Sequence, residues 1–120
     1  VDGFVDLISE EGWKYANYAV SQAYGATSAT RLKQRFDWIK EYIGPERYIV
    51  TENFESWAAT GGVTFRDPER GEMPSLLGMA YWNPVEGRKG GLGTFHMEYE
   101  FSNNYKYLRQ AIQIMNPAKK

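Results

Sequence analysis

The feature of the sequence that most constrains its fold is an amphipathic helix that leads directly into an apolar strand. Apolar residues recur there at intervals of three or four, which is the spacing of one helix face: Leu32, Phe36, Ile39 and Ile43. Ser28 or Thr30 can cap the start of this helix, and Gly44 followed by Pro45 ends it. Because the helix must bury its apolar face, a second apolar layer has to lie against it.

Short apolar runs can supply that layer. We predict a strand near residues 18–24, a buried strand over 47–52 (RYIVTE) and another buried strand over 76–82 (LLGMAYW). Residues 1–12 and 53–75 show little periodicity and are predicted to be loops. Apolar strands that alternate with amphipathic helices are typical of a parallel βαβ architecture in the α/β class.

A second amphipathic helix is predicted near the end of the sequence. Its apolar stripe consists of Tyr105, Leu108, Ile112 and Met115. Asn103 or Asn104 can cap this helix, and Asn116 followed by Pro117 ends it.

Composition excludes several classes of function. The net charge of −1 over 120 residues argues against a nucleic-acid or membrane-surface partner, since such proteins are usually basic. No apolar run approaches the roughly 18 residues that a membrane-spanning helix needs. The absence of cysteine excludes disulfides and thiolate metal sites, and the single histidine offers no second imidazole ligand. We therefore expect neither a metal nor another cofactor.

Ligands of parallel α/β folds gather at the carboxyl ends of the strands. The ends of the three predicted strands read SQAYG, VTENFE and AYWNP, and each carries polar or aromatic side chains. The longest predicted loops also follow strands. The candidate functional residues are therefore those at the strand ends.

The strand-end motifs resemble a known family. NYAVSQAYG resembles the sixth strand of glycoside hydrolase family 18 barrels, where a Gln-x-Tyr pair closes the strand. LLGMAYWNP resembles the eighth strand, which ends on a tryptophan beneath the sugar, and RKGGLGTFHMEYEF resembles the C-terminal end of bacterial endo-β-N-acetylglucosaminidases in that family. The resemblance covers nearly the whole chain. It implies the C-terminal portion, about the last three βα units, of a (β/α)8 TIM barrel with parallel strands.

The resemblance implies a glycosidase that cleaves the chitobiose core of N-linked glycans by a substrate-assisted, retaining mechanism. In such enzymes the 2-acetamido carbonyl oxygen attacks the anomeric carbon and forms an oxazolinium ion. Tyr24 matches the family's tyrosine whose hydroxyl contacts that oxygen, and Gln22 lies on the same strand face two residues earlier. Both are candidate catalytic residues. The alternative is that they are barrel-interior residues that hydrogen-bond to each other.

Trp82 and Asn83 are candidate substrate-binding residues. Trp82 matches the floor of the family's sugar site, where an aromatic face packs on the C–H side of a pyranose. The alternative is a core tryptophan. The segment rich in proline and glycine that begins at Asn83 is expected to turn the chain out of the barrel and to form a wall of the cleft.

Glu52 and Asn53 lie where a seventh strand would end, and Glu55 follows. Paired carboxylates suggest acid–base chemistry, but family 18 carries its acid on the fourth strand. Glu52 and Asn53 are therefore expected to bind substrate by contacting glycan hydroxyls, or else to hold loops.

Three further residues have open or minor roles. The single histidine, His96, is expected to make a structural hydrogen bond. Phe54 and Trp57 are either loop anchors or glycan platforms.

One motif of the family is missing. The acid-bearing strand, D-G-x-D-x-D-x-E, has no match, because Asp2, Asp6 and Glu10 are spaced four apart and do not alternate onto one strand face. We therefore expect residues 1–120 to be one partial barrel domain, with the catalytic-acid strand and its glutamate upstream. Such a fragment would be inactive alone. It would associate with the missing N-terminal part of the barrel, or with itself, to cover its open sheet edges.

A second hypothesis is an independent small α/β module that binds carbohydrate or protein without chemistry. The enzyme hypothesis predicts parallel strands on which Gln22, Tyr24 and Trp82 converge, whereas the module would tolerate antiparallel pairing and scatter these residues. For the enzyme, the substrate would be an N-glycan or glycoprotein. That substrate class implies a bacterial protein that is secreted, periplasmic or on the cell surface.

Overall fold

The computed structural model describes residues 10–117 of the chain. Its strands are β1 Ala19–Gln22, β2 Tyr48–Asn53, β3 Thr64–Asp67, β4 Gly71–Pro74 and β5 Gly91–Phe95. Its α-helices are α2 Glu10–Trp13, α3 Ala29–Asp37, α4 Phe54–Trp57, α5 Ser75–Tyr81 and α6 Lys106–Met115, and two 3₁₀ helices are η1 Pro45–Arg47 and η2 Met97–Asn103.

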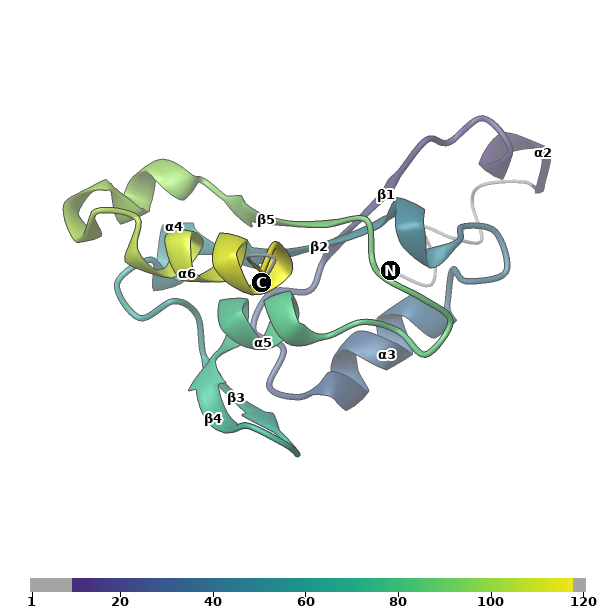
Figure 1. The fold of residues 1–120 in the computed structure, drawn as a ribbon. Coiled ribbons are helices and arrows are strands. Elements are labelled where there is room, and N and C mark those ends of the chain that lie inside the picture. Colours follow the sequence, from purple (N-terminus) through teal and green to yellow (C-terminus); the bar gives the residue numbers. More distant parts are fainter. Residues whose placement is uncertain (1–9, 118–120) are drawn as a thin grey trace.

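A parallel sheet in the order β1-β2-β5 forms the centre of the fold (Figure 1). Each strand is followed by a helix: α3 after β1, α4 and α5 after β2, and α6 after β5. The chain therefore contains three consecutive βα units, and the predicted parallel α/β class is confirmed. The strands predicted near 18–24 and over 47–52 are both present.

The third predicted strand is wrong. Residues 76–82 lie in and directly after helix α5, and the third parallel strand is β5 instead. As a helix, the run places Leu76, Met79 and Ala80 in the core and leaves Tyr81 exposed, which is helical periodicity. A seven-residue apolar run is too short to distinguish these two structures by its pattern.

Alternate residues of β2 face two different environments. Tyr48, Val50 and Glu52 are buried beneath the helices, and the ring of Tyr48 lies edge-on to Phe36 of α3 with 4.9 Å between centroids. Ile49, Thr51 and Asn53 point to the other face and are half-buried. On that face of β1, Val20 is 61% exposed. The described helices α3 and α5 lie on one side of the sheet (Figure 1).

The helix stripe predicted over residues 32–43 is confirmed. All four apolar residues of the stripe are buried in one core cluster: Leu32, Phe36, Ile39 and Ile43. Helix α3 itself ends at Asp37, but the N–H of Ile43 still donates to the carbonyl of Ile39 at 3.1 Å, so the turns continue to Gly44. Ser28 occupies the N-cap position without a capping bond from its side chain.

The last helix differs from its prediction at the start and on one face. Neither predicted asparagine caps it. The buried carboxylate of Glu100 accepts from the backbone N–H groups of Tyr107 at 2.7 Å and Leu108 at 3.0 Å. Ile112, expected in the apolar stripe, is 59% exposed. The helix ends at Asn116 as predicted.

The predicted loop over residues 53–75 contains regular structure. It begins with the short helix α4 and includes the antiparallel hairpin β3–β4. Of the other predicted loop, over residues 1–12, only the part from Glu10 onward lies within the described residues, and it begins the short helix α2.

Gly78 allows α5 to approach the hairpin closely. An added Cβ would lie 2.3 Å from ring atoms of Phe65, which is itself buried. We expect Gly78→Ala to lower the free energy of unfolding by about 1–3 kcal/mol through overpacking, despite alanine's higher helix propensity. Urea unfolding of the wild type and the variant measures this. In a Phe65→Leu background the cost of the same substitution should shrink, and an equal cost in both backgrounds would contradict the contact.

Candidate functional site

The carboxyl ends of the parallel strands bring Tyr24 and Phe95 together. Phe95 is the last residue of β5, and Tyr24 lies two residues beyond β1. Their ring centroids are 6.4 Å apart with the planes tilted by 39°. Since β2 lies between β1 and β5, this contact passes across the end of the central strand. We call this place, with Gln22, Tyr24, Asn53 and Phe95, the carboxyl edge.

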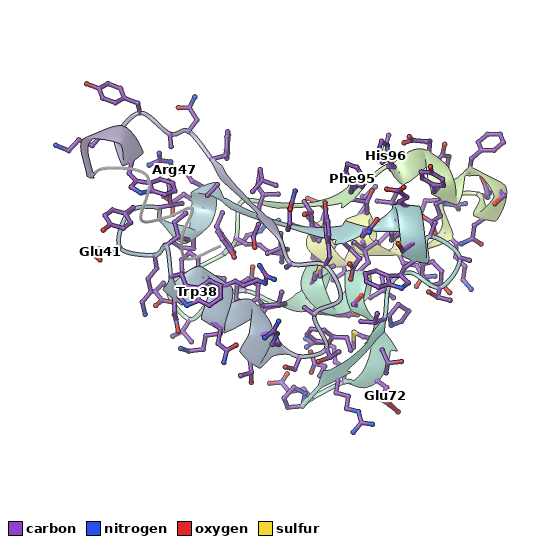
Figure 2. All side chains as sticks on the ribbon, turned by 180° about the vertical axis from the view of Figure 1, so that it is seen from behind. Trp38, Glu41, Arg47, Glu72, Phe95 and His96 are labelled. Carbon is purple, nitrogen blue, oxygen red and sulfur yellow. The ribbon has the colours of Figure 1, made fainter. Side chains whose placement is uncertain are left out.

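Aromatic rings continue from Phe95 along the chain (Figure 2). His96 lies 3.9 Å from the Phe95 ring and 5.9 Å from the Tyr99 ring, as measured between centroids. The Nδ1 atom of His96 is 2.9 Å from the Glu98 carboxylate, which is the hydrogen bond expected from the sequence. His96 also adopts a left-handed backbone with φ of 60°, so the chain turns sharply where β5 ends.

Gln22 and Tyr24 lie at the carboxyl edge, as predicted. Gln22 pairs with Thr51 in the sheet register and its side chain is exposed, whereas Tyr24 is half-buried beside Phe95. Phe95 is 42% exposed, so the edge presents an aromatic surface next to a phenol and an amide. This combination can pack on an apolar sugar face and hydrogen-bond to its substituents.

Glu52 is not available to a substrate, which corrects its prediction as a substrate-binding residue. It shares the helix-facing side of β2 with Tyr48 and Val50 and is 0% exposed. Its Oε1 atom accepts from the backbone N–H groups of Gly25 at 3.0 Å and Asn53 at 2.8 Å, and its Oε2 atom accepts from the Ser75 hydroxyl. Burial raises the pKa of Glu52, and these hydrogen bonds oppose the rise. Glu52 therefore holds loops, the alternative role expected from the sequence.

The other candidate residues at the end of β2 and in α4 stabilise the local fold. The Oδ1 atom of Asn53 accepts from the backbone N–H of Glu55 at 2.9 Å and caps α4, so much of this amide is already engaged. Phe54 is fully buried and is a loop anchor. Trp57 is half-buried, and its ring lies against Gly25, where an added Cβ would be 3.2 Å from it.

Trp82 does not lie at the carboxyl edge, which corrects its predicted position. It is the C-cap residue of α5, and its ring lies edge-on to Tyr48 with centroids 6.4 Å apart. Tyr48 is the first residue of β2, so Trp82 lies at the amino end of the sheet, packed on the core. The alternative of a core tryptophan therefore describes it better.

Asn83 also lies away from the carboxyl edge. Its Oδ1 atom accepts from the backbone N–H of Lys89 at 3.0 Å. The Lys89 ammonium is buried and donates to the carbonyl oxygens of Ala80 and Trp82, at the end of α5. Burial lowers the pKa of Lys89 to about 8. Asn83 thus helps to fix a helix end, contrary to its prediction as a substrate ligand.

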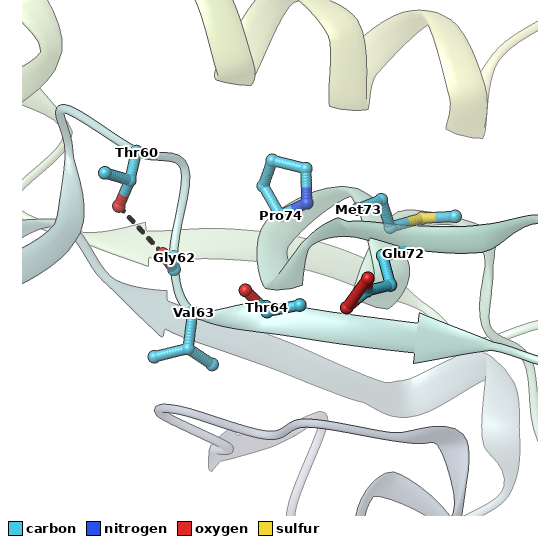
Figure 3. Close-up of a pocket in the computed structure, with 7 residues that line it drawn as sticks. All are labelled: Thr60, Gly62, Val63, Thr64, Glu72, Met73 and Pro74. Carbon is cyan, nitrogen blue, oxygen red and sulfur yellow. Dashed lines mark hydrogen bonds between the residues drawn. The ribbon is translucent and has the colours of Figure 1, made fainter.

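Two hollows of the structure lie elsewhere. One of about 330 Å³ lies at the hairpin (Figure 3), and its lining residues are Thr60, Gly62, Val63, Thr64, Glu72, Met73 and Pro74. Glu72 is the single ionisable residue among them, and it pairs with Arg66. Another hollow, of about 410 Å³, is lined by residues that include Glu41 and Arg47, which Figure 2 places at the opposite end of the molecule from Phe95. Neither hollow is lined by a residue of the carboxyl edge.

Two classes of feature are not found in residues 10–117. No three histidine, aspartate or glutamate side chains gather there as metal ligands. No helix in that range is long and apolar enough to cross a membrane.

Comparison with known proteins identifies the family. The family model for glycoside hydrolase family 18, BT1044-like, matches residues 2–114. The chain belongs to glycoside hydrolase family 18. No curated protein sequence matches it.

Solved structures share the fold of this family 18 chain. A selenomethionine form of a BT1044 variant is 32% identical, with a TM-score of 0.80, and the match covers 94% of this chain and 37% of BT1044. Endo-β-N-acetylglucosaminidase from Cordyceps militaris, as a double mutant in complex with fucosyl-N-acetylglucosamine-Asn, is 22% identical with a TM-score of 0.67. Its apo form is 21% identical with a TM-score of 0.65, and both Cordyceps matches cover 88% of this chain and 38% of the enzyme.

The chain spans less than two fifths of the length of these structures. The family 18 fold is a (β/α)8 barrel, and three of its eight βα units are a comparable share. The predicted fold, a portion of such a barrel, is confirmed. It also explains the uncovered face of the sheet, because that face lines the interior of a complete barrel.

Within this fold, Phe95 is a candidate site residue that was not predicted from the sequence. Its strand, GLGTF, contains two glycines, which are poor strand formers, and so it was not recognised. The signal that could have found it is the aromatic residue that closes this short run directly before His96.

The buried Glu52 predicts a specific pH dependence. Because its pKa is raised in the folded chain, protonated Glu52 contributes stability that is fully present below the ordinary pKa of 4.5 and is lost as the pH rises through the raised value. Glutamine keeps the Oε1 acceptor without a charge. We therefore expect the stability of Glu52→Gln relative to wild type to increase as the pH rises from 4 upward, as measured by urea unfolding at each pH. A constant difference across this range would contradict the raised pKa.

Proposed function

We propose that this chain supplies the substrate-binding residues of an endo-β-N-acetylglucosaminidase that cleaves the chitobiose core of N-linked glycans. The observation that carries the proposal is the meeting of Tyr24 and Phe95 across the end of β2, at the edge where barrel enzymes bind their ligands. The Cordyceps endo-β-N-acetylglucosaminidase, whose structure holds fucosyl-N-acetylglucosamine-Asn, supports the substrate class.

Tyr24 acts on the acetamido group in this proposal. The carbonyl oxygen of the substrate's 2-acetamido group attacks the anomeric carbon, and the bond from that carbon to the leaving sugar breaks. The leaving oxygen takes a proton from a general-acid glutamate, which we place outside this chain. The Tyr24 hydroxyl donates a hydrogen bond to the attacking carbonyl oxygen and holds it in line. Water then opens the oxazolinium ion at the anomeric carbon, so the configuration there is retained.

Phe95 takes the role that the sequence analysis gave to Trp82. Its ring is partly exposed at the end of the third parallel strand, beside Tyr24, and can pack on the C–H face of the sugar whose acetamido group reacts. Gln22 is exposed on β1, the opposite edge strand of the sheet, and also belongs to the carboxyl edge. Its side chain is suited to hydrogen-bond the acetamido group or a hydroxyl.

The remaining part of the active site belongs to other strands in this proposal. Residues 1–120 form a partial barrel domain, and the missing N-terminal part of the barrel is its structural partner and carries the acid. The described residues leave β1 and β5 as edge strands, which such a partner would pair. An N-glycan substrate places the enzyme in a bacterial secreted, periplasmic or cell-surface location.

A comparison of two proteins tests the proposal. The 120-residue chain and the same sequence in its full upstream context are each incubated with a high-mannose glycoprotein, and deglycosylation is read by mass. We expect cleavage by the longer protein only. If neither protein cleaves and the short chain is a cooperatively folded monomer, the enzyme hypothesis fails and the binding module remains.

Substitutions at the carboxyl edge test the assigned roles in the longer protein. Tyr24→Phe removes the hydrogen bond that holds the attacking carbonyl oxygen in line and should lower kcat by about 100-fold. Tyr18→Phe is the matched control, because Tyr18 is exposed just before β1 and has no assigned role. An equal kcat for Tyr24→Phe and Tyr18→Phe would rule out the donor role.

Substitution of Phe95 should change KM more than kcat. Phe95→Leu removes the aromatic face but keeps an apolar side chain, so KM should rise by about tenfold with a smaller change in kcat. Steady-state kinetics with a fluorescent chitobiose-core substrate separate the two. An unchanged KM would show that the sugar does not pack on this ring.

A further inference from the structure

We propose that Glu52 is a positioning residue that fixes Tyr24 for the reaction through one buried carboxylate oxygen. This inference rests on the proposed function for the reaction that Tyr24 would assist. The contacts of Glu52 themselves are present in the structure. Glu52 touches no substrate, because it is 0% exposed on the helix side of the sheet. Its effect is transmitted through the backbone at the carboxyl edge.

A single oxygen accepts hydrogen bonds from the turn after β1 and from the end of β2. The Oε1 atom of Glu52 accepts from the backbone N–H of Gly25, which directly follows Tyr24, and from the backbone N–H of Asn53 at the end of β2. The first bond joins residues that are 27 apart in the sequence. The peptide that links Tyr24 to Gly25 is therefore held to the end of the central strand.

The carboxylate is itself held in one orientation. The Ser75 hydroxyl donates to Oε2, and the same Ser75 oxygen accepts from the backbone N–H of Val63 at 2.9 Å. The two oxygens thus have partners in different segments, which are the turn after β1 and the end of β2 for Oε1 and the start of α5 for Oε2. Rotation of the carboxylate would break the hydrogen bonds of both oxygens.

The Trp57 ring packs against Gly25. Gly25 has a φ of +72°, and an added Cβ would lie 3.2 Å from Cη2 of Trp57. The turn after Tyr24 therefore contacts both the Glu52 carboxylate and the Trp57 indole. Tyr24 leaves this turn with its ring beside Phe95. These contacts hold the backbone from which the Tyr24 side chain extends.

The choice of residue supports a positioning role. Among the residues that the structure describes, Glu52 forms no ion pair, and only hydrogen bonds oppose the cost of burying it. An apolar side chain of similar length would fill the same space without that cost, but it would leave the N–H groups of Gly25 and Asn53 without an acceptor.

Three variants of the longer protein test the proposal. Glu52→Met keeps the length of the side chain and removes both acceptor oxygens, so kcat should fall by about 100-fold as Tyr24 moves, with little change in KM. Glu52→Gln keeps an acceptor at Oε1 and should restore kcat to within a few-fold of wild type. Ile43→Ala is the stability control, because Ile43 is fully buried in the core on the connection before β2 and is not one of the carboxyl-edge residues. It should lower Tm without lowering kcat.

A structural readout separates this proposal from the enzyme hypothesis. In NMR spectra, the nuclear Overhauser contacts between the Tyr24 and Phe95 rings and the exchange protection of the Gly25 amide should be lost in Glu52→Met and kept in Ile43→Ala. If wild type cleaves no glycan, the proposed function fails, and these spectra still decide whether Glu52 positions Tyr24. A Glu52→Met protein that keeps the ring contacts, or that keeps kcat while Tm falls, would show that Glu52 has a merely structural role.

Discussion

The structure depends on one buried carboxylate. Glu52 lies in the helix-facing layer of β2, yet its hydrogen bonds reach the turn after β1, the end of β2 and the first residue of α5. A buried acid is costly unless its oxygens are bound, so these segments must meet in one arrangement for the core to form. The same arrangement places Tyr24 against Phe95. Core formation and the geometry of the carboxyl edge are therefore coupled through Glu52.

The alternation of side chains along each strand separates packing from function. On β2, one set of residues packs beneath α3 and α5, and the other set faces the side that lines the interior in a complete family 18 barrel. At the strand ends this second face carries Gln22 and Phe95. A short three-stranded sheet can thus bear both a core and part of a binding site, because each strand contributes to both faces.

Much of the fold could be predicted from the sequence where the pattern was long enough. The stripe from Leu32 to Ile43 showed a clear helical period, and the run before Glu52 was bounded by turn residues on one side and polar residues on the other. The run over residues 76–82 was too short to separate a helix from a strand, and the two glycines of β5 made that strand hard to predict. Gly91 and Gly93 are tolerated there because they face Ile49 and Thr51, where an added Cβ at Gly93 would lie 3.3 Å from the threonine methyl.

The residues of the candidate site could be predicted only where their strand could be predicted. The positions of Gln22 and Tyr24 at the carboxyl edge could be predicted because their strand has a clear pattern, whereas the wrong third strand led to Trp82 and not Phe95 as the candidate aromatic residue. Glu52 was interpreted as a strand-end ligand, although its parity with Tyr48 and Val50 already indicated the buried face. Its partners Gly25 and Ser75 are 27 and 23 residues away, and no local pattern predicts such contacts.

The central claim is that Tyr24 and Phe95 bind the reacting sugar at the carboxyl edge. Its most direct test is a crystal structure of the longer protein with a chitobiose thiazoline, a stable mimic of the oxazolinium ion. The account predicts that the Tyr24 hydroxyl lies within hydrogen-bond distance of the thiazoline ring and that the Phe95 ring packs on the C–H face of the same sugar. A thiazoline bound in the hollow at the hairpin, or at the amino end beside Trp82, would contradict it.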